Sequence, residues 1–359
     1  MSRRAALLDR VTDAGYAVAW RAVRLLPELL ARLLFAGGGA FAARRGGRGV
    51  RQLRANLDVV TGGRTTDAEL DALTRRAMQS YARYWQEAFR LPVLDVDRVV
   101  ERSTMVGREH LEAARAGGRG IVIALPHSGN WDAAGVWLVR WLGGPFVTVA
   151  ERLRPEALFR RFVDYREGLG MRVLPLTGGD RPSTTVLKEW LTAGGATCLL
   201  VDRDLSGAGV PVRFFGRMTT MPGGPALLAA QTGATLLPAV CQFDGDGWRF
   251  VVHPPVPVDG PGRLRDRVTA AMQQVADAFA GTIAQRPEDW HVLGRIWPEV
   301  GPEGRPAPIV TASSRTAGTA GSRTAGTASS RTAGTAADPA PAGASDDGAP
   351  AGPARTEVG

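Results

Sequence analysis

The chain has 359 residues, of which 44% are hydrophobic, so one large domain with a sizeable core can form. The formal net charge is +9, and all of that excess lies before residue 301, because the remaining segment has as many acidic as basic residues. The two cysteines, Cys198 and Cys241, lie in apolar runs without zinc-ligand spacing, and no apolar run reaches ~18 residues, which excludes a disulfide framework and a membrane-spanning helix.

The first informative segment is residues 5–35, where apolar side chains such as Leu25, Leu29 and Leu33 recur at helical spacing opposite a charged face. Pro27 predicts a break in this helix, and the three glycines at 37–39 predict its end. Five arginines follow: Arg44, Arg45, Arg48, Arg51 and Arg54. Residues 1–43 therefore predict amphipathic helices that contact an anionic membrane surface, with packing on the domain as the alternative. No secretory signal is expected here.

Residues 67–89 predict a helix capped by Thr66 or Asp67. Its aromatic side chains share one face, which belongs either to the core or to the floor of a pocket for an acyl chain: Tyr81, Tyr84, Trp85 and Phe89.

From residue 120 the pattern alternates between strands and helices. Short β-branched runs predict strands at 120–125, 145–150, 171–176, 196–201, 234–243 and 248–253. Helical spacing predicts helices at Trp131–Leu142, 155–169, 182–191, 222–231 and Leu264–Ile283. Residues 44–300 therefore predict an α/β domain, with a mainly parallel central sheet flanked by helices and an antiparallel pair at 235–253. Residues 301–359, rich in Ala, Gly, Thr, Ser and Pro and with short repeats, predict a disordered tail.

The strand at 120–125 leads through Pro126 into His127, at the carboxyl edge where reactive groups gather in α/β sheets. Asp132 follows five residues later, and Gly129 permits a tight turn between them. A carboxylate on one ring nitrogen leaves the other nitrogen to accept a proton, which predicts a general base. The chain has four histidines and none lies near His127 at helical spacing, so no metal site is predicted. Ser128 lacks a nucleophile elbow.

Two further polar segments follow later strands. Asp202, Arg203 and Asp204 end the strand at 196–201, on the same edge as His127 if the strands are parallel. One of these aspartates is an alternative partner for His127, and Arg203 suits a phosphate; the alternative is a local turn with an ion pair. Arg213 precedes Gly223 and Gly224, which stand at a helix start, where backbone N–H groups either bind a phosphate or an oxyanion or are simply capped.

Four blocks, LPHSGNWD, VDRDLSGAGVPVRFFG, TTMPGGPALLA and PEDWHVLGRIWPE, together resemble the phosphatidylinositol mannoside acyltransferases. These are relatives of the lipid A late acyltransferases within the lysophospholipid acyltransferase superfamily. The resemblance implies a glycerol-3-phosphate acyltransferase-like fold. It also implies transfer of a fatty acyl group, usually palmitoyl, from acyl-CoA to a mannose hydroxyl, with acyl-CoA as co-substrate and no cofactor.

Carried onto this sequence, the resemblance makes His127 the base and Asp132 its motif partner, with Asp202 at a position where the family has glutamate. Whether Asp132 or Asp202 orients the imidazole stays open at this point. The candidate substrate-binding residues are Asn130, Arg203, Asp204, Arg213, Gly223 and Gly224.

The expected partners are acyl-CoA, an anionic glycolipid and the membrane surface, with a peripheral location on the cytoplasmic face. One alternative is the same chemistry with another glycolipid or lysophospholipid acceptor, or with an acyl carrier protein donor. A second is a non-catalytic lipid-binding protein. A nucleic-acid partner is not expected, because the arginine cluster adjoins an apolar helix rather than exposed aromatic residues.

Overall fold

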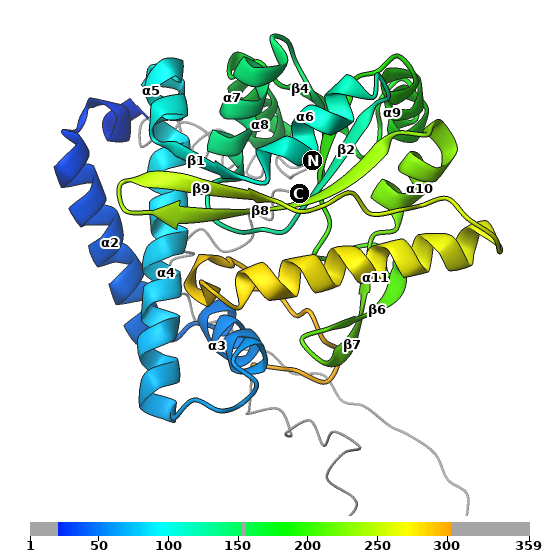
Figure 1. Cartoon of the computed structure of the whole chain (residues 1–359). Helices are drawn as coiled ribbons and strands as arrows, with labels where there is room; N and C mark the ends of the chain where they lie inside the picture. Colours follow the sequence, from blue (N-terminus) through cyan, green and yellow to red (C-terminus); the bar gives the residue numbers. More distant parts are fainter. Residues whose placement is uncertain (1–20, 153–155, 303–359) are drawn as a thin grey trace, which may run out of the picture. The chain divides into compact units, whose positions relative to one another are not determined.

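The computed structural model describes residues 21–152 and 156–302. The predictions for residues 1–20 and for the tail from residue 303 onward lie outside the described residues. The first helices are α2 (Glu28–Arg45), α3 (Arg48–Val60) and α4 (Asp67–Arg90), and α2 lies alongside α4 (Figure 1). Within the described ranges, each helix is too short or too polar to cross a bilayer.

Helix α2 begins after Pro27, as predicted, but its predicted end at the glycines at 37–39 is wrong. The helix continues through them to Arg45, because one of them serves helix packing. A Cβ atom on Gly39 would lie 2.6 Å from the carbonyl oxygen of Met78 in α4. Glycine at this point therefore lets the two helix backbones approach closely.

Helix α4 begins with the predicted cap. The Thr66 side chain accepts from the backbone N–H of Glu69, and the Glu69 carboxylate accepts from the backbone N–H of Thr66, which together form a capping box. Of the predicted aromatic face, Tyr84 is 2% exposed, and its ring stacks on Trp131 with centroids 4.1 Å apart. This contact ties α4 to the segment that follows His127.

The central sheet has seven strands in the order β1-β9-β8-β2-β5-β3-β4. Their bounds are β1 (Ser103–Val106), β2 (Ile121–Leu125), β3 (Val147–Ala150), β4 (Arg172–Pro175), β5 (Ala196–Leu200), β8 (Thr235–Asp244) and β9 (Gly247–Val252). Every neighbouring pair is parallel except β8 and β9, which are antiparallel. The predicted α/β class, mainly parallel sheet and antiparallel pair are confirmed.

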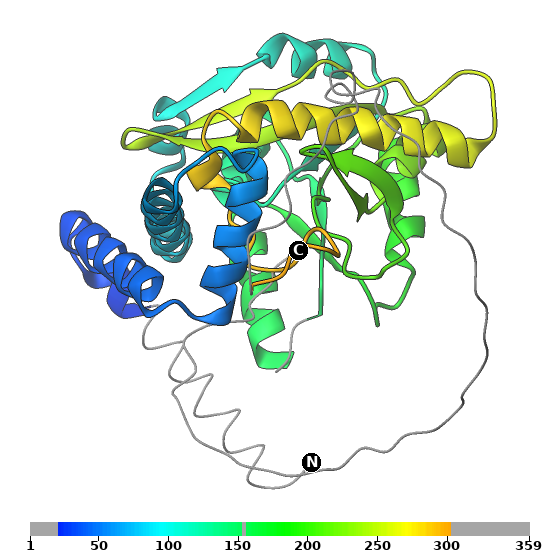
Figure 2. The ribbon, with the colours of Figure 1, turned by 90° about the horizontal axis from the view of Figure 1, so that it is seen from below.

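Helices cover both faces of this sheet (Figures 1 and 2). On one face, α6 (Arg108–Ala116), α7 (Trp131–Leu142) and α8 (Glu156–Gly168) pack with α4 against Ile121, Ile123 and Leu125 of β2. On the other, α9 (Ser183–Thr192), α10 (Gly224–Thr232) and α11 (Leu264–Ile283) pack against Val122 and Ala124. Alternate β2 side chains thus enter opposite cores, which explains why this strand is apolar throughout.

The sequence patterns missed α3 and several shorter elements. The shorter ones are α5 (Val96–Glu101), α6, the edge strand β1, the one-turn helices η1 (Leu91–Val93) and η2 (Pro287–Asp289), and the hairpin of β6 (Val210–Phe214) and β7 (Arg217–Met221). The hairpin turns at Phe215 and Gly216, which have φ angles of 48° and 76°. Positive φ at both positions is typical of a two-residue hairpin turn, but Phe is unusual there, so the turn signal was weak.

Candidate active site

The loop between β2 and α7 presents His127 at the carboxyl edge of the sheet, as predicted. His127 is 8% exposed. Gly129 has φ of 58°, and a Cβ atom there would lie 2.6 Å from the carbonyl oxygen of Cys241 in β8. Glycine is therefore required for the turn, and it lets the loop pack directly on a neighbouring strand.

Asp202, which follows β5, holds the imidazole. Its Oδ1 lies 2.6 Å from Nδ1 of His127, and its Oδ2 accepts from the backbone N–H of His127 at 3.0 Å. Because β2 and β5 are parallel neighbours, their carboxyl ends bring the two residues together. Of the two aspartates left open by the sequence, Asp202 is thus the one that contacts His127.

Asp202 is fully buried, at 0% exposure. Burial opposes its ionisation, but the charge of His127 and the hydrogen bonds from His127 and Trp290 outweigh burial and lower the pKa of Asp202 below its ordinary value. An ionised Asp202 favours the imidazole tautomer with hydrogen on Nδ1, so Nε2 carries the lone pair.

Asp132 is instead part of a separate buried cluster. Its Oδ1 accepts from Nε of Arg166 at 3.0 Å, and its Oδ2 accepts from the Tyr84 hydroxyl at 3.0 Å. Burial raises the pKa of Tyr84 well above its usual value, which keeps the hydroxyl protonated as a donor. The expectation that Gly129 folds Asp132 back onto His127 is contradicted, because Asp132 is the first-turn acid of α7 and points toward α4 and α8.

Asn130 is the N-cap of α7 and is 0% exposed. Its Oδ1 accepts from the backbone N–H of Ala133 at 2.9 Å, and its Nδ2 donates to Glu87 Oε2 at 2.8 Å. Both ends of the amide therefore bind protein groups. This gives Asn130 the role of starting the helix after His127, and its predicted contact with substrate stays a prediction.

Asp204 shapes its own loop. Its Oδ1 accepts from the backbone N–H groups of Ser206 and Gly207 at 3.1 and 3.0 Å, and its Oδ2 accepts from Gly209 at 2.8 Å. Burial opposes ionisation here too, but these hydrogen bonds lower the pKa of Asp204. These contacts give Asp204 a turn-forming role, and its predicted contact with substrate stays a prediction. Arg203, next to Asp202, is half-buried, and its role in binding substrate stays a prediction.

Arg213 is not brought to His127 by any described contact. Its backbone N–H donates to Gln273 of α11 at 2.7 Å, and its guanidinium donates to the carbonyl of Gly216 at 3.0 Å. Gly223 and Gly224 stand at the start of α10, as predicted. A Cβ atom on Gly223 would lie 3.2 Å from Val210 and Val268, which gives this glycine a packing role. The proposed substrate contacts of both glycines stay predictions.

A segment near the end of the described chain brackets the His127 loop. The carbonyl of Asp289 accepts from the Gly129 N–H, and the carbonyl of His127 accepts from the His291 N–H, each at 2.8 Å. Trp290, between them, is 0% exposed and donates its indole N–H to Asp202 Oδ2 at 2.8 Å. We call residues 289–291 the bracket segment. Its residues lay in a block that carried the family resemblance, but nothing local to the sequence indicated their partners.

The side chains of the bracket segment are themselves held. Ser80 of α4 donates to Asp289 Oδ1 at 2.7 Å and lies 2.8 Å from His291 Nε2. Burial raises the pKa of Asp289 to about 6 and lowers the pKa of His291 to about 3. His291 is therefore neutral at physiological pH. The contacts of Ser80 fasten α4 to the bracket segment, which in turn binds the loop that carries His127.

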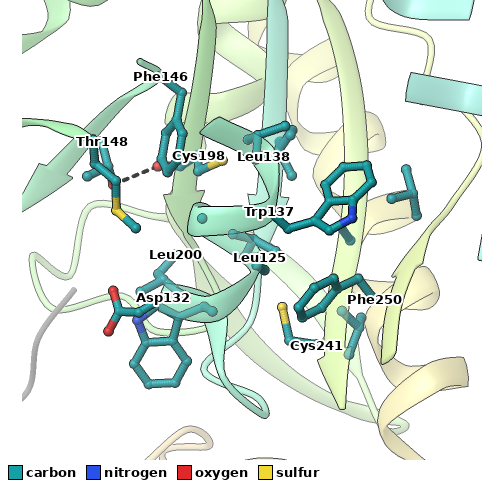
Figure 3. A pocket seen from close by; sticks show the side chains of 18 of the residues that line it. Leu125, Asp132, Trp137, Leu138, Phe146, Thr148, Cys198, Leu200, Cys241 and Phe250 are labelled. Atoms are coloured by element: carbon teal, nitrogen blue, oxygen red, sulfur yellow. Dashed lines mark hydrogen bonds between the residues drawn. The ribbon is translucent and has the colours of Figure 1, made fainter. Parts of the chain in front are cut away.

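An apolar cavity lies between α7 and the face of the sheet, and the centre of a water-sized sphere can reach about 70 Å³ of it. Figure 3 shows Asp132, Leu125 and Leu200 toward one end of it and Phe146 and Leu138 toward the other. Trp131 also lines the cavity, and its ring lies 5.6 Å from that of His127, centroid to centroid. Trp131 therefore connects the cavity to the His127–Asp202 pair, which does not itself line it. Within residues 21–152 and 156–302, no group of three or more metal-ligating side chains is arranged to hold a metal ion.

Comparison with known proteins assigns the chain to a family. The family model described as bacterial lipid A biosynthesis acyltransferase matches residues 2–299. The phosphatidylinositol mannoside acyltransferase of Mycolicibacterium smegmatis is 52% identical over 297 residues, which cover 83% of this chain and 95% of that protein. The enzyme of the same name from Mycobacterium tuberculosis is 48% identical over 296 residues, covering 82% and 91%. The chain belongs to the bacterial lipid A biosynthesis acyltransferase family and is an acyltransferase.

Proposed function

We propose that this acyltransferase moves a fatty acyl group, palmitoyl, from acyl-CoA to a mannose hydroxyl of a phosphatidylinositol mannoside. The observation that carries the proposal is the 2.6 Å contact between His127 Nδ1 and Asp202 Oδ1 beside an apolar cavity. Two relatives that are about half identical to this chain are named phosphatidylinositol mannoside acyltransferases, which supports the acceptor class.

In the proposed mechanism, Asp202 holds the proton on Nδ1, and Nε2 of His127 takes the proton of the mannose hydroxyl. As that proton leaves, the hydroxyl oxygen attacks the carbonyl carbon of the thioester. The tetrahedral intermediate then expels the thiolate of coenzyme A, which takes the proton back from the imidazolium. The products are the mannose ester and the free thiol, with no covalent enzyme intermediate.

The apolar cavity supplies a place for the acyl chain. Its lining includes side chains from β2, β5 and α7, and burying a methylene is worth about 0.8 kcal/mol. A long saturated chain is therefore retained by apolar contact, while its thioester stays near the polar edge of the sheet where His127 lies.

The N-terminal helix supplies the proposed contact with the membrane. Helix α2 buries Ala31 and Gly39 toward α4 and leaves an apolar stripe exposed, made of Leu29, Leu30, Leu33, Leu34 and Phe41. The exposed Arg44, Arg45, Arg48 and Arg51 follow. Apolar residues beside a basic cluster suit an anionic lipid surface, so we propose peripheral binding on the cytoplasmic face, where acyl-CoA is present.

The test is an assay of the full chain with palmitoyl-CoA and anionic vesicles that contain phosphatidylinositol mannoside, followed by mass analysis of the lipid. His127→Ala should lower turnover by about 10²–10⁴-fold while still sedimenting with the vesicles. The matched control is His110→Ala, a half-buried histidine of α6, which should keep full turnover. Full turnover in His127→Ala would refute the mechanism. Transfer only from acyl carrier protein, or only to a lysophospholipid or lipid A acceptor, would refute the proposed donor or acceptor.

A further inference from the structure

The cavity extends from the His127 edge toward the amino ends of the strands. Leu125 and Leu200 are the last residues of β2 and β5, whereas Phe146 and Met171 directly precede β3 and β4. The registers pair Val147 with Thr197 and with Arg172, so Phe146 and Met171 lie level with the start of β5. They are thus four residues below Leu200, which is about 13 Å along the strands.

Helix α7 forms the opposite wall of this cavity. Its lining residues include Trp131, Asp132, Gly135 and Leu138, which succeed one another at helical spacing from the His127 end downward. Among these positions, Gly135 is the one without a side chain, and the residues that follow it in α7, 136–142, are all larger than alanine. A glycine inside a helix destabilises it by about 1 kcal/mol relative to alanine, so its presence calls for a packing reason.

That reason is the side chain of Met171. A Cβ atom on Gly135 would lie 2.3 Å from Cε of Met171, 3.3 Å from its Sδ and 3.2 Å from Cζ of Phe146. Met171 therefore lies across the bare backbone of α7. It is 6% exposed and lines the cavity, so its displaced end moves within the packed interior, where the cavity is the free space beside it. Because methionine is unbranched and flexible, such a displacement is feasible without breaking the fold.

We propose that Gly135 and Met171 together set the length of the acyl chain that the enzyme accepts, with Met171 as the floor of the cavity. This inference rests on the proposed function, because it takes the cavity to be the acyl site. A methyl group added at position 135 should shorten the cavity, and removal of the Met171 side chain should lengthen it. Pockets of this kind discriminate one methylene by about 10–200-fold.

The first experiment measures kcat/KM for Gly135→Ala with lauroyl-, myristoyl-, palmitoyl- and stearoyl-CoA. We expect the ratio of palmitoyl to myristoyl transfer to fall by about tenfold or more. The matched control is Gly281→Ala in α11, where an added Cβ meets no atom within 4 Å, and its chain-length profile should equal that of the unaltered enzyme.

The second experiment uses Met171→Ala, alone and combined with Gly135→Ala. The single variant should raise the ratio of stearoyl to palmitoyl transfer by about tenfold, and the double variant should lose the shift toward short chains. Equal losses for all four donors, or unchanged ratios in both single variants, would overturn the inference by reducing the pair to core packing. If Gly135→Ala does not fold, the Met171→Ala ratio alone decides. Absence of transfer from every acyl-CoA by the unaltered enzyme would instead refute the proposed function.

Discussion

Asp202 and Asp132 are both buried carboxylates near the His127 loop, but they have different hydrogen-bond partners. Asp202 is 0% exposed and binds an imidazole, a backbone N–H and an indole. Asp132 is 2% exposed and binds the guanidinium of Arg166 and the hydroxyl of Tyr84. The first has an imidazole as its neighbour, and the second has a permanent cation. In the proposed mechanism Asp202 therefore supports His127, whereas Asp132 fastens α7 to α4 and α8.

The largest expected effect comes from Asp202→Asn. An amide has no charge to stabilise the imidazolium and can present its NH₂ group to Nδ1, which places the ring hydrogen on the wrong nitrogen. We expect kcat to fall by about 10²–10⁴-fold, measured with saturating donor in the vesicle assay. Asp202→Glu, which keeps the carboxylate, should retain more activity than the Asn variant. Equal activity of Asn and unaltered enzymes would remove Asp202 from the mechanism.

Asp132→Asn should act mainly on stability. It leaves the guanidinium of Arg166 buried without a counter-charge, which costs about 3–5 kcal/mol of unfolding free energy, measured by urea denaturation. The control is Asp97→Asn, which removes an exposed pair with Arg140 and should cost less than about 1 kcal/mol. If Asp132→Asn kept full stability and lost turnover as completely as Asp202→Asn, the division of roles between the two aspartates would be wrong.

Trp290→Phe should have the smallest of these effects. The ring stays in place, but Asp202 loses one hydrogen bond, and bonds to charged groups contribute about 1.5–3 kcal/mol, so we expect kcat to fall about tenfold. Asp202 has a lowered pKa, so its ionised form contributes stability above its unfolded-state pKa and loses it as pH falls through the folded-state pKa. Loss of the indole N–H raises that folded-state pKa.

The acid limb of the kcat profile should therefore move to higher pH in Trp290→Phe. Trp297→Phe is the matched control, because its indole donates at 3.1 Å to the carbonyl of Phe214 in the same aromatic cluster and not to Asp202. A profile that moves equally in both variants would show that general packing, and not the bond to Asp202, is responsible.

The sequence was most informative where periodicity and burial coincide. The bounds of α7 and α11 agree with the prediction, because each carries an uninterrupted helical pattern between clear ends. The sequence was least informative where a residue is needed for a contact with a distant part of the chain. The glycines at 37–39 resemble a helix end, yet Gly39 serves packing against α4. Strand β1 has only four residues and alternating exposure, and so gave little signal.

The candidate site divides in the same way. His127 follows from its place after a buried strand, and Asp202 from the shared edge of parallel strands. Sequence spacing favoured Asp132 equally, because a distance along the chain does not say toward which element a side chain points. The contacts of Trp290 and the rest of the bracket segment could not be predicted from neighbouring residues, because Trp290 and Asp202 are separated by 88 residues.

The bracket segment also has a consequence for the order in which the enzyme is made. A nascent chain that has emerged from the ribosome only as far as β9 already contains His127 and Asp202, but not the strand-like pairing of residues 289–291 with the loop. Domains generally fold as units, so this domain can complete its fold only after this short stretch has been made. Catalytic competence is thereby delayed until nearly the whole domain has been translated, and a chain interrupted before Trp290 lacks the indole that anchors Asp202.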